Sequence, residues 1–444
     1  MRIILFLRAA FLLFCVLSLF GFAVLWAQAD PYAFPQRPIL RIASIPQYVI
    51  DTIRDVRLDP FALSRTPDEF GALTYRPVPN HSGHRIEGLV MRHGPSADRP
   101  QPGWRILYGL FHIDGEPRYA ALALSPDFAV EHVWPIDRAL LDQGQAAFQE
   151  APYPHGFALL PDGSLVAAFD TLYPTVRVDA CGRLLWTAGD KLNHALYAAE
   201  DGRTLWGVGT DSTVRRVDLA TGRVMRTIRA GDIAAANPEL SLFDMLRRDD
   251  NGLGANARGT QDPFHEEPYH INDAEPLPSA LAPAFPQFAA GDLLMSFRSL
   301  NLVAVVDPDS LRVKWFTNDY TLRQHDPDWE ANGEISVLDN QMGRRFSRIV
   351  NFDPATGQRR VAVDGRSVNF YTRIRGKHQS LADGSIAITS SAQGRALEIG
   401  RDGRISSEIL VRDPTHPGSN FVLSEMQVLP AAPSPLAKVR QCPK

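Results

Sequence analysis

Residues 155–169 read HGFALLPDGSLVAAF, a histidine followed by two short apolar runs that Asp162-Gly163 separates. Apolar runs of this length around an Asp-Gly pair are typical of two β-strands joined by a tight hairpin. Asp and Gly tolerate the positive φ angles that such turns require. Similar runs at residues 293–297, 303–306 and 386–388 indicate an all-β protein.

A second class of turn recurs along the chain at a long interval. Its members separate an apolar strand from a strand that often ends in Trp. Apart from one gap of about 89 residues, successive turns lie about 39 to 53 residues apart, the size of a four-stranded propeller blade. Six turns predict a six-bladed β-propeller, with a pair of β-sandwiches or another all-β repeat as the alternative. The turns lie at residues 126–127, 179–182, 218–222, 307–309, 353–357 and 402–403.

The long gap predicts an insertion between about residues 230 and 290, with a short helix at residues 239–248 followed by a Gly- and Pro-rich loop. The propeller itself is expected to span residues 101–428. Residues 30–100 predict an N-terminal extension that packs on the propeller. The proline-rich tail at residues 429–444 is expected to be loosely ordered.

The N-terminus predicts export. Arg2 and Arg8 precede residues 9–26, which carry no charge, and Ala27-Gln28-Ala29 fits a small-residue cleavage site. The apolar stretch is long for a signal peptide and just long enough to cross a bilayer. Residues 1–29 are therefore either a cleaved signal peptide or an uncleaved membrane anchor. The positive flank predicts that the rest of the chain is periplasmic, free or anchored to the inner membrane.

Composition restricts the partners of the chain. It has 46 Lys and Arg against 50 Asp and Glu, a formal net charge of −4, so no basic excess indicates nucleic acid. Besides Cys15 in the leader, the chain contains Cys181 and Cys442, whose placement predicts neither a metal site nor a disulfide bond.

Five of the twelve histidines recur at a related place in the repeat. His155, His194 and His325 each stand seven residues before an Asp-Gly or Asn-Gly pair, and His378 stands five residues before one. His270 opens a longer version of the same segment. Because the innermost strand of each blade lines the central channel, these side chains are expected to meet at one end of it.

Clustered histidines allow two kinds of chemistry. Imidazole is a common metal ligand, and Asp273, Glu275 and Asp326 lie near these histidines in the sequence. Alternatively, imidazolium and guanidinium groups bind an oxyanion. Arg298 lies in the same predicted blade as His270, and an arginine beside histidines lowers metal affinity. The sequence therefore favours an anion site with no metal and no cofactor.

Four segments contain a set of motifs in a fixed order. They include His270-Ile271-Asn272, Ser296-Phe297-Arg298 and Gln324-His325, and they lie at residues 155–163 with 179–186, 262–275, 291–315 and 324–340. In these motifs the chain resembles, over roughly residues 104–410, the arylsulfotransferase family of bacterial β-propellers. The resemblance implies transfer of a sulfuryl group, without a nucleotide donor, from a phenolic sulfate ester to a phenol. Its partners would be this small-molecule aryl sulfate donor and phenolic acceptor, and a membrane if the leader is uncleaved.

The resemblance also implies roles for individual residues. The histidine of the Gln-His motif is the family's nucleophile, so a transient sulfohistidine is expected there. A neutral imidazole is a good nucleophile near neutral pH, and covalent catalysis predicts ping-pong kinetics. The other two motifs bind the sulfuryl oxygens, and a histidine from an earlier blade assists. The predicted catalytic residues are His325, His270, Arg298 and His194, and the predicted substrate-binding residues are Asn272, His155 and His378.

Three features depart from the family pattern. Where many relatives have two adjacent histidines, this chain has Asn193 before His194. Asp326 and Asp328 follow the expected nucleophile and would oppose anion binding if they faced the channel, and the insertion changes the channel mouth. Two alternatives therefore stay open: a non-catalytic exported propeller that binds a ligand or envelope partner, and a metal-dependent propeller enzyme.

Overall fold

The computed structural model describes residues 16–21, 23, 61, 64–141, 153–170, 173–246, 269–431, 434–439 and 442. Residues 64–144 and 152–444 form one compact unit, which holds the strands described below. Most of the predicted leader and residues 247–268 of the predicted insertion lie outside the described residues. Among the described residues, no helix combines the length and apolar character needed to cross a membrane.

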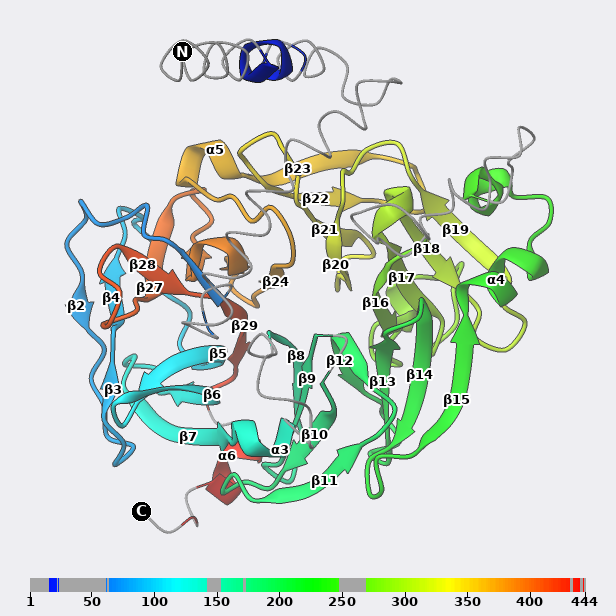
Figure 1. Ribbon diagram of the computed structural model, residues 1–444. Helices are drawn as coiled ribbons and strands as arrows, with labels where there is room; N and C mark the ends of the chain where they lie inside the picture. The colour runs from blue at the N-terminus through cyan, green and yellow to red at the C-terminus, as the bar shows by residue number, and fades with distance from the viewer. Residues whose placement is uncertain are drawn as a thin grey trace, which may run out of the picture. The chain divides into compact units, whose positions relative to one another are not determined.

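Six antiparallel sheets surround a central axis as the blades of a β-propeller, and in each blade the strand named first lies nearest the axis (Figure 1). Blade 1 contains β29 (Leu423–Leu429), β5 (Trp104–Ile113), β6 (Glu116–Leu124) and β7 (Val130–Ile136). Blade 2 contains β8 (Pro154–Leu159), β9 (Leu165–Phe169), β10 (Thr175–Val178) and β11 (Leu184–Ala188). Blade 3 contains β12 (Leu192–Ala198), β13 (Thr204–Gly209), β14 (Thr213–Asp218) and β15 (Val224–Arg229).

The second half of the ring repeats this order. Blade 4 contains β16 (Ile271–Pro276), β17 (Leu293–Phe297), β18 (Leu302–Val306) and β19 (Val313–Thr317). Blade 5 contains β20 (His325–Trp329), β21 (Ile335–Asp339), β22 (Arg348–Phe352) and β23 (Arg359–Asp364). Blade 6 contains β24 (Lys377–Ser380), β25 (Ile386–Ser390), β26 (Arg395–Ile399) and β27 (Ile405–Val411), and is extended by β4 (Leu89–His93) and β2 (Arg76–Pro77).

Blade 1 closes the ring, because its innermost strand β29 comes from the C-terminal part of the chain and pairs with β5. β3 (Ile86–Glu87) also pairs with β5, and β1 (Arg65–Pro67) pairs with β28 (Ser419–Phe421). A closed ring gives the backbone groups of β29 and β5 partners that an open edge would lack. Segments far apart in the sequence therefore hold one another in place.

The six recurrent turns all lie at the same place in the blade, between the third and fourth strands. Residues 126–127 join β6 to β7, and residues 179–182 join β10 to β11. The other four turns join the corresponding strands of blades 3 to 6. The prediction of a six-bladed propeller is confirmed, and the β-sandwich alternative is wrong.

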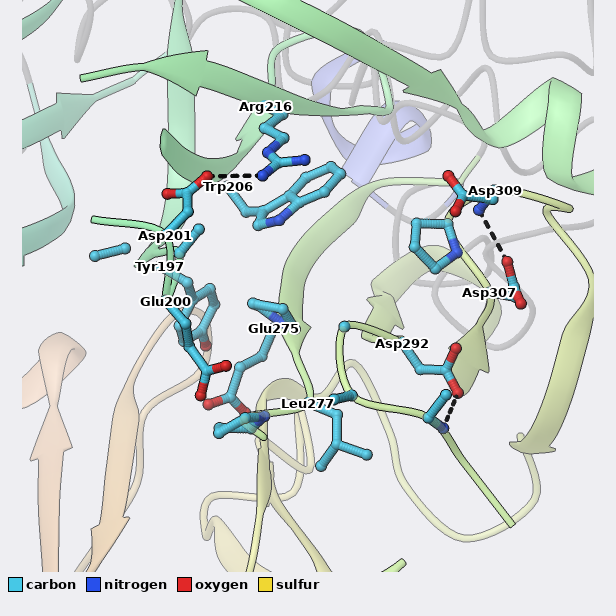
Figure 2. Close-up of a pocket in the computed structure, with 18 of the residues that line it drawn as sticks. Tyr197, Glu200, Asp201, Trp206, Arg216, Glu275, Leu277, Asp292, Asp307 and Asp309 are labelled. Atoms are coloured by element: carbon cyan, nitrogen blue, oxygen red, sulfur yellow. Dashed lines mark hydrogen bonds and ion pairs between the residues drawn. The ribbon is translucent and has the colours of Figure 1, made fainter. Parts of the chain in front are cut away.

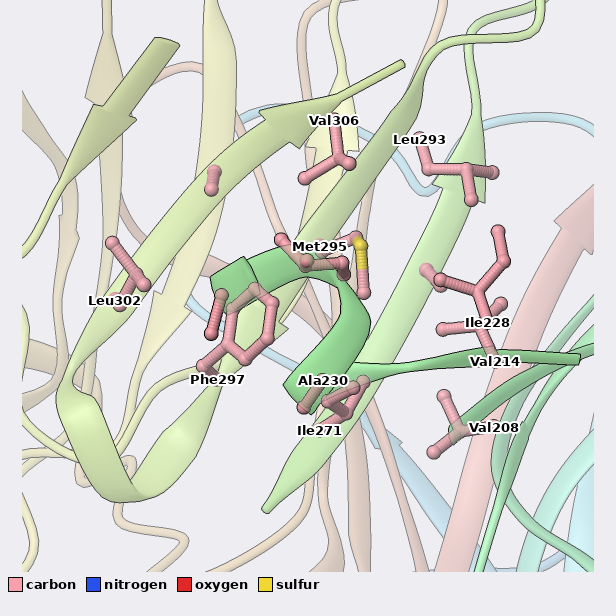
Figure 3. Packing of buried hydrophobic residues seen from close by; sticks show 14 of the residues in the cluster. Val208, Val214, Ile228, Ala230, Ile271, Leu293, Met295, Phe297, Leu302 and Val306 are labelled. Atoms are coloured by element: carbon pink, nitrogen blue, oxygen red, sulfur yellow. The ribbon is translucent and has the colours of Figure 1, made fainter. Parts of the chain in front are cut away.

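Apolar side chains fill the space between neighbouring blades. Val208, Val214 and Ile228 of blade 3 pack against Leu293 and Met295 of blade 4 (Figure 3). Neighbouring blades cover both faces of a blade, so β17 and β18 are buried along their whole length. Their sequences are therefore almost continuously apolar. Burying one side chain of this size contributes roughly 1.5–3 kcal/mol, so packing between blades holds the ring together.

Short helices lie in the connections between strands and, in one case, after the last strand. α4 (Ala230–Ala236) and η2 (Ser241–Leu246) begin the predicted insertion. η2 covers residues 241–246 of the helix expected at residues 239–248, of which residues 247–248 lie outside the described residues. Further helices are α3 (Arg138–Leu141), η4 (Ala282–Ala284), η5 (Arg298–Leu300), α5 (Gly365–Val368), η6 (Ser391–Gln393) and α6 (Ser434–Val439).

A disulfide bond joins Cys181, in the turn between β10 and β11, to Cys442 near the C-terminus, with the two Cα atoms 5.4 Å apart. The expectation that these cysteines do not pair is wrong. It failed because the two residues are 261 positions apart in the sequence, and only the closed ring brings the C-terminal segment to blade 2.

Candidate active site

Four histidines from blades 2 to 5 gather near the axis. The ring centroids of His155 and His194 lie 4.1 Å apart, and those of His194 and His270 lie 5.3 Å apart. His155, His194 and His325 line a cavity of about 30 Å³. The expected convergence is therefore found for these four side chains, while their chemical roles stay predictions.

Each of these histidines lies at or beside an irregularity in the innermost strand. The pairing register shifts within residues 154–157 of β8, 192–196 of β12, 271–273 of β16 and 325–327 of β20. A β-bulge bends a strand and re-aims its side chains. β24 of blade 6, in contrast, pairs with β25 without a shift.

Blades 2 and 3 approach each other closely because residue 156 is glycine. A Cβ at Gly156 would lie 2.0 Å from the carbonyl oxygen of His194, so any other residue would push the two strands apart. The Oδ1 atom of Asn193 lies 2.8 Å from Nδ1 of His194. The departure from the family's histidine pair at Asn193 thus leaves a side chain that orients His194.

His378 lies apart from the other four histidines. Its Nδ1 contacts Asp326 Oδ2 at 2.9 Å and its Nε2 contacts Ser336 Oγ at 2.7 Å, so both ring nitrogens bond within the protein. Its five-residue spacing places it about 6.6 Å deeper along the strand than a seven-residue spacing does. Gly376 takes the ring position and lines the cavity instead. The structure therefore does not bring His378 to the ring.

The hydrogen bonds of His325 determine which ring nitrogen carries the proton. Its Nδ1 lies 2.7 Å from Asn340 Oδ1 and 3.2 Å from the carbonyl oxygen of Arg323, both of which accept. Asn340 Nδ2 donates to the carbonyl oxygens of Thr372 and Arg375, which fixes the amide orientation. The Nδ1–H tautomer follows, and Nε2 keeps its lone pair, which accepts from the backbone N–H of Arg375 at 3.2 Å.

The buried histidines are held in the neutral form. Burial, and then the charge of Arg298, lowers the pKa of His325 well below its ordinary value. Burial also lowers the pKa of His155 and of His194, with added contributions from Arg375 and from His155 respectively. A neutral imidazole, whose unprotonated nitrogen keeps its lone pair, is the nucleophilic form.

Arg298 belongs to the same cluster. It follows β17 directly, is 8% exposed, and its Nη1 contacts His270 Nε2 at 2.9 Å. Asn272 Nδ2 donates to the carbonyl oxygen of Gln324, the residue before His325. The structure thus brings Arg298, His270 and Asn272 beside His325, as the sequence motifs predicted.

The negative charge of Asp326 is neutralised inside the protein. Its Oδ1 lies 2.5 Å from Nζ of Lys377, which also pairs with Asp273 Oδ2 at 3.1 Å. Burial raises the pKa of Asp326, but Lys377 and the hydrogen bond from His378 outweigh it and lower that pKa to about 2. Asp326 follows His325 in the sequence and was expected to oppose anion binding. Its pairing with Lys377 weakens this repulsion.

Asp326, Asp328 and His378 also have the spacing of a metal-ligand group. Each offers one atom, and these atoms lie within 4.8 Å of one another. The ammonium group of Lys377 already occupies one side of Asp326 and competes with a cation there. Asp328 and His378 do not line the cavity of His155, His194 and His325, but line a separate cavity of about 290 Å³.

Sequence reasoning missed three residues of the site: Asn340, Arg375 and Lys377. Asn340 ends one of the segments that carry the family resemblance, but nothing in its sequence context indicated a contact with His325. Arg375 and Lys377 flank Gly376, the residue seven positions before Asp383. Applying the seven-residue spacing strictly in blade 6 points to this pair.

A larger cavity, of about 530 Å³, lies between blades 3 and 4 (Figure 2). Its lining includes Trp206 and Arg216, and more carboxylates than cations. The Arg216 guanidinium is paired with Asp201, 2.8 Å away. None of the described residues that line this cavity is a histidine, and its acidic wall disfavours a sulfate ester.

Several solved structures are similar to this chain at low identity. A protein of unknown function from Bacteroides caccae is 12% identical with a TM-score of 0.46, covering 74% of this chain and 99% of that chain. A chain of a nidogen/laminin complex is 10% identical with a TM-score of 0.44 and the same coverage. Virginiamycin B lyase from Staphylococcus aureus is 10% identical with a TM-score of 0.34, and the match covers 59% of this chain and 71% of that chain.

A search of curated proteins finds no significant match. A family model described as arylsulfotransferase (ASST), however, matches residues 158–412, which is more than half of the chain. The matched region begins within β8, extends just past the end of β27, and contains His194, His270, His325 and Arg298, whereas His155 lies three residues before it. On this match, the chain belongs to the arylsulfotransferase (ASST) family.

Proposed function

We propose that this protein transfers a sulfuryl group from an aryl sulfate to a phenol through a sulfohistidine at His325. The observation that carries the proposal is the environment of His325, a buried neutral imidazole that carries its proton on Nδ1 and lines a cavity together with His155 and His194. Membership of the arylsulfotransferase family supports the same reaction class. A cavity of about 30 Å³ suits the sulfuryl end of the donor and leaves the aryl ring outside.

The first half-reaction forms the N–S bond. Nε2 of His325 attacks sulfur, the S–O bond of the ester breaks, and the phenolate leaves with the bonding electron pair. Binding of the anionic ester favours protonation of a neighbouring imidazole, which donates its proton to the phenolate oxygen. Asn340, which accepts from Nδ1–H, stabilises the positive charge that develops on the imidazole ring.

The second half-reaction reverses these steps with another phenol. Its oxygen attacks the sulfur of the sulfohistidine, its proton passes to the neighbouring imidazole, and the N–S bond breaks and returns the electron pair to Nε2. Arg298 and His270 stabilise charge on the sulfuryl oxygens in both transition states.

We also propose that the protein works outside the cytoplasm, in the periplasm or at the outer face of the inner membrane. The disulfide between Cys181 and Cys442 supports this location, since such bonds persist in oxidising compartments. The charged and apolar pattern of residues 1–29 supports it independently.

An assay with 4-nitrophenyl sulfate and phenol tests the function. We expect nitrophenol release that depends on phenol, with parallel double-reciprocal lines, the pattern of a ping-pong mechanism. Activity is expected to survive extensive treatment with EDTA. Absence of nitrophenol release from the folded, disulfide-bonded protein contradicts the proposal, and loss of activity that only a metal restores favours the metal-dependent alternative.

The acid limb of the pH profile is expected to lie well below the ordinary histidine pKa of about 6.5. Burial lowers the pKa of His155, His194 and His325, so the imidazoles stay neutral as the pH falls through that value. The profile of kcat/KM for the donor reports these groups in the free enzyme. A half-maximal point at or above pH ~6.5 contradicts the assignment of a buried neutral nucleophile.

A further inference from the structure

We propose that Arg375 is a second arginine of the sulfuryl site, binding a sulfuryl oxygen through Nη1. The proposal rests on the proposed function and adds a substrate-binding residue that the sequence motifs do not contain. Arg375 lies two residues before the start of β24 of blade 6 and lines the same cavity as His155, His194 and His325.

Two contacts hold the guanidinium of Arg375 in one place. Its Nη2 donates to both carboxylate oxygens of Asp170, each 3.0 Å away. The Cζ atom of Arg375 lies 3.1 Å from the ring centroid of Tyr153, so the planar guanidinium stacks on the aromatic face. Asp170 and Tyr153 both flank blade 2, so this arginine of blade 6 reaches the neighbourhood of His155.

The third feature is a nitrogen without a partner. Nη1 of Arg375 is buried, and none of the described residues accepts a hydrogen bond from it. A buried N–H of a charged group that lacks an acceptor is costly, and such groups in native proteins usually meet water or a ligand. Because the guanidinium carries positive charge and Arg375 lines the cavity, the fitting ligand is an oxyanion.

The backbone of Arg375 also forms hydrogen bonds with residues of the site. Its N–H donates to His325 Nε2, and its carbonyl oxygen accepts from Asn340 Nδ2. Its φ angle is 60°, in a region that residues other than glycine rarely adopt. Strained backbone that surrounding contacts maintain is common where a side chain must be aimed at a ligand. Arg298 beside His270 and Arg375 beside His155 thus place guanidinium groups on two sides of the nucleophile.

Inorganic sulfate, measured by isothermal titration calorimetry, is the probe for Arg375. Arg375→Gln is expected to weaken sulfate binding by roughly 10- to 100-fold, the effect of losing one charge-assisted hydrogen bond, and to raise KM for the donor by a similar factor. Added guanidinium chloride at low concentration is expected to restore part of the affinity in Arg375→Ala. Arg360→Gln, which changes an exposed arginine on the outer strand of blade 5, is the matched control and is expected to bind as the parent does.

The outcomes separate this inference from the proposed function. Unchanged sulfate affinity and donor KM in a folded Arg375→Gln variant overturn the role of Arg375, even if the parent is an active sulfotransferase. A parent that binds sulfate in an Arg375-dependent way but transfers nothing supports the oxyanion site and contradicts the proposed function. If Arg375→Gln does not fold, Arg375→Lys, which keeps the charge but not the planar fork, is measured in its place, and parent-like affinity there overturns the inference.

Discussion

Replacing His325 by Asn is expected to reduce sulfuryl transfer by roughly 10³-fold or more, the scale seen when a covalent nucleophile is removed. Asn is close in size and its amide N–H can replace Nδ1–H as the donor to Asn340 Oδ1, but it cannot form the N–S bond. The loss is expected in kcat, since the fold and the groups that bind sulfate are kept. Release of nitrophenol from 4-nitrophenyl sulfate measures it directly.

Trapping distinguishes a nucleophile from a residue that only supports the site. The parent protein, mixed with donor alone and quenched rapidly, is expected to carry a sulfuryl group on the peptide that contains His325. His416→Asn, which changes a half-exposed histidine outside the cluster, is the control and should retain both activity and label. Labelling of a different histidine, or full activity of His325→Asn, contradicts the mechanism.

Arg298→Gln is expected to lower kcat/KM by roughly 10²- to 10³-fold, the usual effect of removing one preorganised donor from an oxyanion site. The change removes a buried positive charge and the contact of Nη1 with His270 Nε2. Since charge on the sulfuryl oxygens is spread most widely in the transition state, we expect kcat to fall more than sulfate affinity. Steady-state kinetics with two donors of different leaving-group pKa separate the two effects.

Two further variants control for the loss of charge. Arg298→Lys keeps the charge without the planar fork and is expected to recover only part of the rate. Arg312→Gln removes an exposed arginine of blade 4, paired with Glu239, and is expected to leave kcat unchanged. Parent-like kcat in Arg298→Gln removes this residue from the mechanism.

The repeat was readable from the sequence because turn chemistry is local. Asp-Gly and similar pairs mark positions that need a positive φ, and they recur once per blade wherever the neighbouring strands do. The same period placed His155, His194 and His325 at equivalent positions on three inner strands, and the structure brings them together. The site could be outlined to this extent because position in a repeat translates into position around an axis.

Other features could not be read this way. His378 looked equivalent to its neighbours, yet a shift of two residues and a strand without a bulge take it out of the ring. The pairing of Cys181 with Cys442 depends on where the closed ring places the C-terminus. Asn340 and Arg375 contact His325 through turns whose paths no local pattern specifies.

The sequence by itself determined the all-β class, the number of blades and the inner strand on or beside which each clustered histidine lies, because these depend on short-range turn and strand preferences. The tertiary structure alone decided the tautomer of His325, the neutralisation of Asp326 by Lys377 and the guanidinium of Arg375 at the cavity. Those features depend on contacts between residues about 15 to 205 positions apart, which form only when the blades close around the axis.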